Sequence, residues 1–177
     1  MVGAVVVRDD EVVGRGLHRC PGDPHAERVA LDEAGDRARG ATLYVNIEPC
    51  SHQGRTPPCI DAVLQSGIKR VVVSTLDPDP RVSGGGVKAL RAAGLQVDVG
   101  KLAFEATRLN EAYLSYKTCG RPFVTAKAAI SLDGRLATRR RESQWISGEI
   151  ARRRTHQLRA ETDAIGVGIG TILNDDP

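Results

Sequence analysis

Aromatic residues are scarce in this sequence, which has two Phe, three Tyr and one Trp among 177 residues. Any hydrophobic core must therefore consist mainly of aliphatic side chains, and a hydrophobic content of 41% is enough to build one. The sequence also shows no signal peptide and no apolar run of about 18 residues, the length that a membrane-spanning helix requires. We therefore expect a soluble, cytoplasmic protein that does not bind a membrane.

Charge of one sign is not concentrated in this chain either. The formal net charge is +3, and two Arg triplets, at residues 139–141 and 152–154, account for much of the positive excess. No basic stretch is interleaved with aromatic side chains, which is the pattern typical of nucleic-acid binding. The composition therefore gives no indication of nucleic-acid binding.

The chain has only four Cys, and without a secretory signal two of them suit a metal better than a disulfide bond. Cys50 follows a Pro and Cys59 follows a loop rich in Gly and Pro, while His25 lies nearer the N-terminus. One His and two Cys provide three ligands, the number typical of a catalytic zinc that keeps its fourth position for water. The pattern therefore predicts a Zn2+ site at His25, Cys50 and Cys59.

Glu27 is the residue that we expect to move protons. Zinc lowers the pKa of its bound water to about 7, so that a nucleophile is available at neutral pH. After attack on an amidine-like ring carbon, the leaving nitrogen must be protonated, and Glu27 lies two residues after His25. The motif H-x-E followed by P-C-x-x-C is the signature of zinc deaminases. This chain departs from it, because eight residues instead of two separate Cys50 from Cys59.

An alternative is that these residues bind no metal. A His-x-Glu pair is common in proteins, and two Cys nine positions apart can be small buried hydrophobic residues. The order of the motifs, with Pro49 before Cys50 and a Gly- and Pro-rich loop before Cys59, favours zinc.

Strand and helix patterns alternate along the first two thirds of the chain, which predicts a three-layer α/β/α domain with a mixed sheet. The sheet is expected to be antiparallel at an opening hairpin and parallel after it. Ligands at the ends of strands and the starts of helices would then meet at one edge of the sheet. The expected strands are residues 2–7, 11–17, 41–47, 69–74 and 95–99, and the expected helices are residues 25–35, 87–93, 102–116 and one that starts at residues 57–58.

The pattern starts again after residue 118. We expect a strand at residues 123–130, a turn at residues 131–135, a helix at residues 147–160 and a strand at residues 164–167. Fewer than sixty residues are too few for an independent core. The prediction is a deaminase domain at residues 1–118 and the first part of a second domain at residues 119–177.

Several motifs together resemble the bifunctional riboflavin-biosynthesis deaminase–reductase family. Residues 24–27 (Pro-His-Ala-Glu) and residues 48–59, with the long loop between the two Cys, resemble its deaminase domain. That loop distinguishes the family from tRNA and cytidine deaminases, which keep the shorter spacing. Other motifs resemble the start of its reductase domain, namely Lys127 with residues 131–135, residues 143–147, residues 168–171 and residues 175–177.

The resemblance implies a cytidine-deaminase-like domain followed by the start of a dihydrofolate-reductase-like α/β domain. It implies hydrolytic deamination of 2,5-diamino-6-ribosylamino-4(3H)-pyrimidinone 5′-phosphate, and NADPH-dependent reduction of the ribosyl group by the full-length protein. The family has a helix and a Pro-Asn-Pro loop before its first strand, and most of its reductase sheet follows the segment present here. We therefore expect a chain truncated at both ends, without reductase activity, and leave open whether it forms a homo-oligomer.

The resemblance also implies roles for individual residues. His25, Cys50 and Cys59 would hold zinc and Glu27 would be the proton shuttle. Arg55 suits a phosphate, because its guanidinium can form a charged fork, although His52 and Arg55 could also be solvated loop residues. Trp145 is as compatible with a core position as with a cofactor wall. The implied substrate contacts are His52, Arg55, Asp77 (to the ribose), Ser143 and Arg159, and the implied NADPH contacts are Trp145, Thr171 and Asp175.

Two other functions remain open at this point. One is the deamination of another nucleobase or nucleoside, against which the loop from Ser51 to Pro58 argues. The other is a non-catalytic remnant that binds zinc for folding only.

Overall fold

The computed structural model describes residues 1–140 and 142–175, with side chains as far as residue 173 in the last helix. The chain divides into two compact units, residues 1–124 and residues 125–177. Each unit is described by itself below. Within the described residues, no helix combines the length and the apolar character that crossing a bilayer would need.

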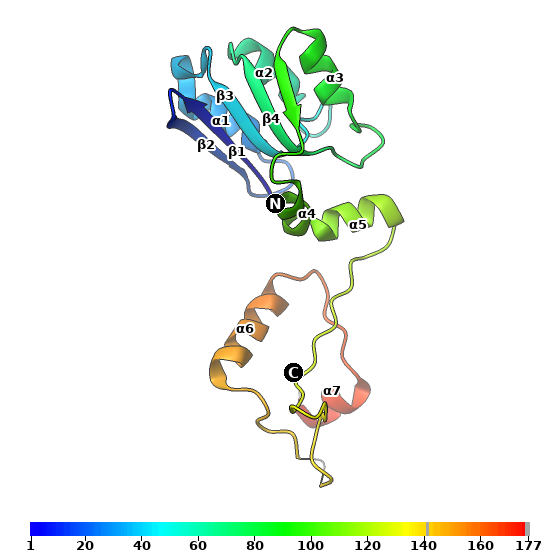
Figure 1. Cartoon of the computed structure of the whole chain (residues 1–177). Coiled ribbons are helices and arrows are strands. Elements are labelled where there is room, and N and C mark those ends of the chain that lie inside the picture. Colours follow the sequence, from blue (N-terminus) through cyan, green and yellow to red (C-terminus); the bar gives the residue numbers. More distant parts are fainter. Residues whose placement is uncertain (141, 176–177) are drawn as a thin grey trace. The chain divides into compact units, whose positions relative to one another are not determined.

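The first unit contains a five-stranded sheet with the strand order β2-β1-β3-β4-β5 (Figure 1). The hairpin of β1 and β2 is antiparallel, and β1 also pairs antiparallel with β3, whereas β3, β4 and β5 run parallel to one another. This confirms the mixed sheet expected from the sequence. The strands are β1 (Val2–Arg8), β2 (Glu11–His18), β3 (Thr42–Ile47), β4 (Arg70–Thr75) and β5 (Gln96–Val99).

One face of the sheet carries an aliphatic core, as the scarcity of aromatic residues required. Alternate residues of the strands point to this face, and Val6, Leu43, Val71 and Val73 are all fully buried there. Helices α1, α2 and α3 supply the other side of the same core. They span Ala26–Ala34, Cys59–Gln65 and Gly85–Ala92, and a short 3-10 turn, Gly35–Ala38, follows α1.

Helix α1 lies unusually close to β2 because two glycines of that strand face it. A Cβ atom on Gly16 would lie 1.8 Å from the carbonyl oxygen of Ala26, and one on Gly14 would lie 2.1 Å from that of Ala30. Any larger residue at either position would push the helix away from the sheet. Since His25 immediately precedes α1, this contact fixes where His25 and Glu27 enter the site.

The opposite face of the sheet is less completely covered. Val72 points to that face and is only 5% exposed, and α4 (Ala103–Leu109) packs against β3 and β4. Towards β1 and β2 the face is more open, because Tyr44 is 38% exposed and Leu17 is 44% exposed.

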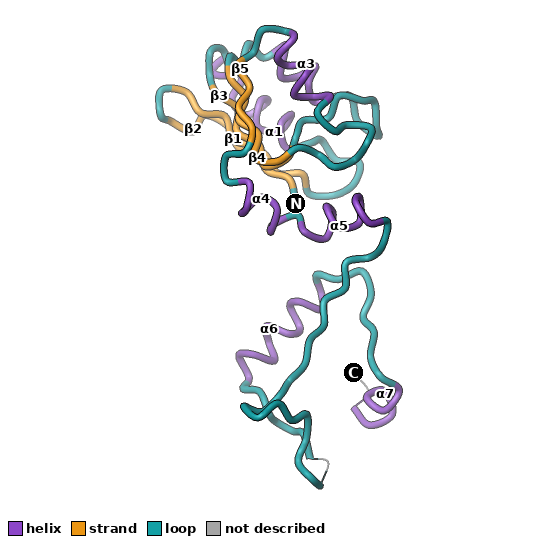
Figure 2. The backbone as a smooth tube through the Cα atoms, turned by 45° about the vertical axis from the view of Figure 1, so that its right-hand side comes forward, coloured by secondary structure: helices purple, strands orange, loops and turns teal. Residues whose placement is uncertain are grey.

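The helix expected at residues 102–116 is two helices. Helix α4 ends at Leu109 and α5 runs from Glu111 to Cys119, so that Asn110 terminates one and begins the other. The backbone of Asn110, with φ −114° and ψ 19°, is not helical. Continuous helical spacing was compatible with one helix, but α4 and α5 are separate helices (Figure 2). Tyr113 and Lys117 of α5 contact Asp77 and Asp79 in the loop after β4.

The second unit contains two helices, α6 (Glu149–Ala160) and α7 (Ile169–Asp175), and no strand among its described residues (Figure 2). The helix expected at residues 147–160 and the turn at residues 131–135 are confirmed, since Gly134 N–H donates to the carbonyl of Ser131 at 2.9 Å. The strands expected at residues 123–130 and 164–167 are wrong. A strand is stabilised by pairing, and no described neighbour offers these segments a ladder of hydrogen bonds.

Candidate metal centre and substrate cavity

His25, Cys50 and Cys59 bring three metal-ligating atoms together, all within 4.8 Å of one another. Nδ1 of His25 lies 3.0 Å from Sγ of Cys59 and 3.6 Å from Sγ of Cys50. Zinc binds His nitrogen at about 2.0 Å and Cys sulfur at about 2.3 Å, so ligands of a tetrahedral site lie roughly 3.5 Å apart. The spacing and the nitrogen and sulfur donors therefore fit zinc. Cys20, the remaining Cys of the first unit apart from Cys119, is exposed and lies outside the group.

The ligands meet because three elements end or begin at the same edge of the sheet. His25 precedes α1, Cys50 follows β3 and Cys59 is the first residue of α2. The backbone N–H of Cys59 also donates to Sγ of Cys50 at 3.2 Å. This contact ties the start of α2 to the end of β3, and so determines the geometry of the pair of Cys.

The ionisation of the ligands is shaped by their neighbours. A hydrogen bond from the thiol of Cys59 lowers the pKa of Cys50, while that same contact, together with burial, raises the pKa of Cys59. Burial and the charges of His18 and His52 lower the pKa of His25. A thiolate and a neutral imidazole are the forms that bind a metal, so Cys50 and His25 are biased towards their ligand forms.

Glu27 lies inside the first turn of α1 and is almost completely buried, with 3% of its surface exposed. Burial raises the pKa of its carboxyl group. Its Oε2 atom has no hydrogen-bond partner, which is costly for a buried carboxyl oxygen. Among the described side chains only His52 Nδ1 and Asn110 Nδ2 share this condition. Two of the three residues are ones that the sequence analysis places in the site.

A cavity of about 480 Å³ opens beside the ligands. His25, Glu27 and Cys50 line one part of it, and Asp77 and Tyr113 line another. A cavity of this size can hold a substrate of nucleotide size in part or whole. The remaining lining residues are Met1, Val2, His18, Arg19, Pro21, Ile47, Glu48 and Asn110.

Glu48 is a residue of this site that the sequence analysis did not single out. It is 3% exposed, and its Oε1 accepts from the N–H of Val87 at 2.9 Å. Its Oε2 accepts from the N–H of Gly84 at 2.8 Å and from that of Asp77 at 3.3 Å. One carboxylate therefore joins the end of β3 to the loop after β4 and to the start of α3. In the sequence, the one feature that could have pointed to Glu48 as a site residue is its position directly before Pro49 and Cys50.

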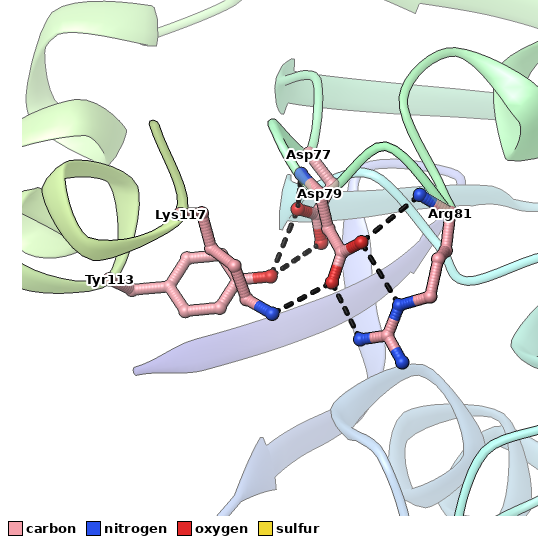
Figure 3. Close-up of polar contacts among 5 residues, drawn as sticks. All are labelled: Asp77, Asp79, Arg81, Tyr113 and Lys117. Carbon is pink, nitrogen blue, oxygen red and sulfur yellow. Dashed lines mark hydrogen bonds and ion pairs between the residues drawn. The ribbon is translucent and has the colours of Figure 1, made fainter. Parts of the chain in front are cut away.

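The loop after β4 carries a second polar cluster (Figure 3). Asp79 is buried and accepts from the guanidinium of Arg81 at 2.7 and 3.1 Å and from Nζ of Lys117 at 2.8 Å. The hydroxyl of Tyr113 donates to Asp77. Both carboxylates are thus tied to α5, which follows the turn at Asn110.

The other two deaminase residues implied by the family resemblance lie on the loop between the two Cys. His52 is half-buried, and its charge lowers the pKa of His25, so it lies near the metal ligands. Arg55 is exposed and does not line the 480 Å³ cavity. The structure therefore brings Asp77 to the cavity, leaves His52 next to the ligands and leaves Arg55 in solvent.

The residues implied for the reductase lie in the second unit. Ser143 is exposed, Arg159 is half-buried on α6 and Thr171 is half-buried on α7. Trp145 is 69% exposed and lies against the guanidinium of Arg152, whose Cζ is 4.3 Å from the ring centroid. It therefore occupies neither a core nor a closed pocket. The side chain of Asp175 lies outside the described residues.

Family models match both parts of the chain. Residues 1–75 match the cytidine and deoxycytidylate deaminase zinc-binding region, and residues 122–177 match the RibD C-terminal domain. The mixed sheet, the His and Cys donors and the first match together define a zinc-dependent, cytidine-deaminase-like domain.

Individual relatives are similar along the whole chain. The riboflavin biosynthesis protein RibD of Aquifex aeolicus is 54% identical over 99% of this chain, which covers 49% of that protein. The RibD structure from Acinetobacter baumannii (form 1) has a TM-score of 0.91 and 46% identity, covering 99% of this chain and 49% of its own. A diaminohydroxyphosphoribosylaminopyrimidine deaminase/5-amino-6-(5-phosphoribosylamino)uracil reductase structure from Thermotoga maritima has a TM-score of 0.92 and 46% identity, covering 99% and 51%.

The chain is therefore similar to RibD proteins along its whole length, as its motifs indicated. It spans about half the length of the curated relatives that it matches.

Proposed function

We propose that this chain carries the zinc-dependent deaminase of riboflavin biosynthesis. Its substrate would be 2,5-diamino-6-ribosylamino-4(3H)-pyrimidinone 5′-phosphate, whose ring amine is replaced by oxygen with release of ammonia. One observation carries the proposal. The donor atoms of His25, Cys50 and Cys59 lie within 4.8 Å of one another, beside the buried and unpartnered Oε2 of Glu27. The RibD relatives support the assignment of the substrate.

In this proposal His25, Cys50 and Cys59 hold the metal. Zinc, when bound, supplies the acidity that makes water nucleophilic at neutral pH. Glu27 takes a proton from the attacking water and gives a proton to the leaving amine, so that ammonia departs instead of amide ion. Its burial beside the ligands supports this role, because the carboxyl group can carry a proton without competition from bulk water.

The substrate groups remote from the ring would bind along the rest of the cavity. Asp77 lines the cavity with Glu27 and Cys50, which supports the proposal that it would accept hydrogen bonds from ribose hydroxyls. His52 is proposed as a second substrate contact beside the ligands. Arg55 would reach the phosphate from the loop before Cys59, which requires that its exposed side chain turn towards the substrate.

The domain division remains a proposal, with deaminase chemistry in residues 1–118 and the start of a reductase in residues 119–177. The NADPH-dependent reduction belongs to the full-length family. Ser143 and Arg159 are proposed as substrate contacts of the reductase, and Trp145, Thr171 and Asp175 as its NADPH contacts. The cytoplasmic location also stays a prediction, and whether the chain forms a homo-oligomer stays open.

Ammonia release tests the proposal directly. The zinc-loaded chain is incubated with the diaminopyrimidine ribotide and, separately, with cytidine, adenosine and guanine. Release from the ribotide alone is the expected result. Release only from another base would assign a different deaminase. Bound zinc without turnover of any substrate would indicate a protein that uses the metal for folding only.

A further inference from the structure

Tyr113 holds the carboxylate of Asp77 by both of its oxygens. The phenol hydroxyl lies 2.9 Å from Oδ1 and 3.0 Å from Oδ2 (Figure 3). Oδ1 also accepts from the N–H of Asp79 at 2.8 Å. Each carboxylate oxygen can accept more than one hydrogen bond, so Asp77 keeps acceptor capacity towards the cavity that both residues line.

The backbone of Asp77 is held independently of its side chain. Its N–H donates to Oε2 of Glu48, which also accepts from Gly84 at the far end of the same loop. The backbone contact sets where Asp77 stands but leaves the torsion angles of its side chain free. Among the described contacts, those of Tyr113 and of the Asp79 N–H are the ones that fix the orientation of the carboxylate itself.

Helix α5 is placed by this polar cluster and not by a core. None of its residues from Glu111 to Cys119 is buried. Its contacts with the loop are polar, from Tyr113 to Asp77 and from Lys117 to Asp79. Burial, together with the hydrogen bond to Asp77, raises the pKa of Tyr113, so its hydroxyl remains a donor at neutral pH.

We propose that Tyr113 is a positioning residue for the deaminase, which holds the Asp77 carboxylate in the orientation that accepts hydrogen bonds from the sugar hydroxyls of the substrate. The inference rests on the proposed function and deepens it. Tyr113 acts through Asp77 and takes no part in the proton transfers at Glu27. Its removal therefore weakens substrate binding and leaves the chemical step unchanged.

The test compares Tyr113→Phe with Tyr116→Phe in the zinc-loaded chain. Tyr116 lies on the same helix and is 56% exposed, so the control removes the same hydroxyl group from a position outside the cavity. We expect Tyr113→Phe to raise KM for the ribotide about fivefold, with kcat changed by less than about twofold. The control keeps the wild-type KM, and both variants keep the zinc content and melting temperature of the wild type to within a few degrees.

A double-variant cycle with Asp77→Ala separates positioning from direct contact. If Tyr113 acts through Asp77, Tyr113→Phe adds no further increase in KM once Asp77 is removed. An increase of the same size in the Asp77→Ala background would mean that Tyr113 contacts the substrate itself, and would overturn the inference. A wild-type KM in the single Tyr113→Phe variant would overturn it as well.

Ionisation of the phenol gives a second readout, which is compared only between variants that keep the melting temperature of the wild type, because unfolding would also lower the pKa of Tyr113. The chain has three Tyr, and ultraviolet titration of wild type and Asp77→Asn should show that one of them ionises at lower pH once the carboxylate is neutral. Identical titrations would contradict the contact. Failure of the proposed function is recognised separately, because the wild type would then release no ammonia from the ribotide. Turnover by the wild type with an unchanged KM in Tyr113→Phe defeats only the present inference.

Discussion

Nδ1 of His25 lies 3.0 Å from Sγ of Cys59, although 34 positions separate the two residues in the sequence. The distance is short because α1 and α2 begin at the same edge of the sheet, next to the end of β3. The glycines of β2 then let α1 approach the sheet closely enough for His25 to reach the two Cys.

Loss of a metal ligand should abolish zinc binding. We expect His25→Ala and Cys59→Ser to reduce zinc from about one ion per chain to a small fraction of that, because two remaining ligands rarely retain the metal. Elemental analysis after dialysis measures this. Cys20→Ser is the matched control, since Cys20 is exposed and outside the donor group. Full zinc in either ligand variant would contradict the assignment.

Glu27→Gln should keep zinc and lose activity. The amide has nearly the same shape but cannot carry a proton, so we expect kcat to fall by about two to four orders of magnitude. Glu33→Gln is the control, because Glu33 is exposed on the same helix and its amide oxygen can still accept from the N–H of Arg15. Activity within tenfold of the wild type would remove Glu27 from the proton-transfer role.

Glu48→Gln should destabilise the first unit. The amide replaces one acceptor oxygen with an N–H2 donor, which would face the backbone N–H groups that now point at the carboxylate. Leaving such groups unpaired in a buried position costs about 1–3 kcal/mol. Urea denaturation measures the loss, and Glu105→Gln on the exposed side of α4 should change the free energy of unfolding by less than about 0.5 kcal/mol. An equal effect of both substitutions would show that the Glu48 contacts contribute little.

The Asp79 cluster should make stability depend on pH in the acidic range. Hydrogen bonds from Arg81, and to a smaller extent from Lys117, hold the pKa of Asp79 below its ordinary value of 3.8. A carboxyl group with a lowered folded-state pKa stabilises the protein above its unfolded-state pKa, and this contribution is lost as the pH falls through the folded-state value. The stability difference between wild type and Asp79→Asn should therefore be full near about pH 6 and shrink below about pH 4.

The matched comparison for Asp79 is Asp32→Asn. Asp32 is exposed and pairs with Arg28 one turn earlier on α1, and exposed pairs of this kind contribute little. Denaturation curves at several pH values should show a pH-dependent difference for Asp79→Asn and almost none for Asp32→Asn. A difference for Asp79→Asn that is constant from about pH 3 to pH 7 would contradict the account.

The metal ligands could be predicted from sequence because their chemistry leaves a local signature. His25 with Glu27, and Cys50 after a Pro, identify the donors whatever the rest of the fold does. The mixed sheet was also predictable, since its strands are short, aliphatic runs separated by turns. These features depend on residues close together in the chain.

Other parts of the site depend on pairs distant in sequence. Tyr113 and Asp77 are 36 positions apart, and Glu48 and Val87 are 39 apart. Neither contact can therefore be predicted from a local sequence pattern. The break at Asn110 is likewise invisible in a continuous helical spacing. The two strands expected at residues 123–130 and 164–167 are not formed, because an apolar, β-branched run forms a strand only where a partner strand exists.

X-ray absorption at the zinc edge of the metal-loaded chain tests the central claim most directly. We expect two sulfur ligands at about 2.3 Å, one nitrogen ligand at about 2.0 Å and one further light-atom ligand from water. Cys50→Ser should leave one sulfur in any residual signal. A site with three or four sulfurs, or with none, would contradict the assignment of His25, Cys50 and Cys59 as an open, catalytic zinc centre.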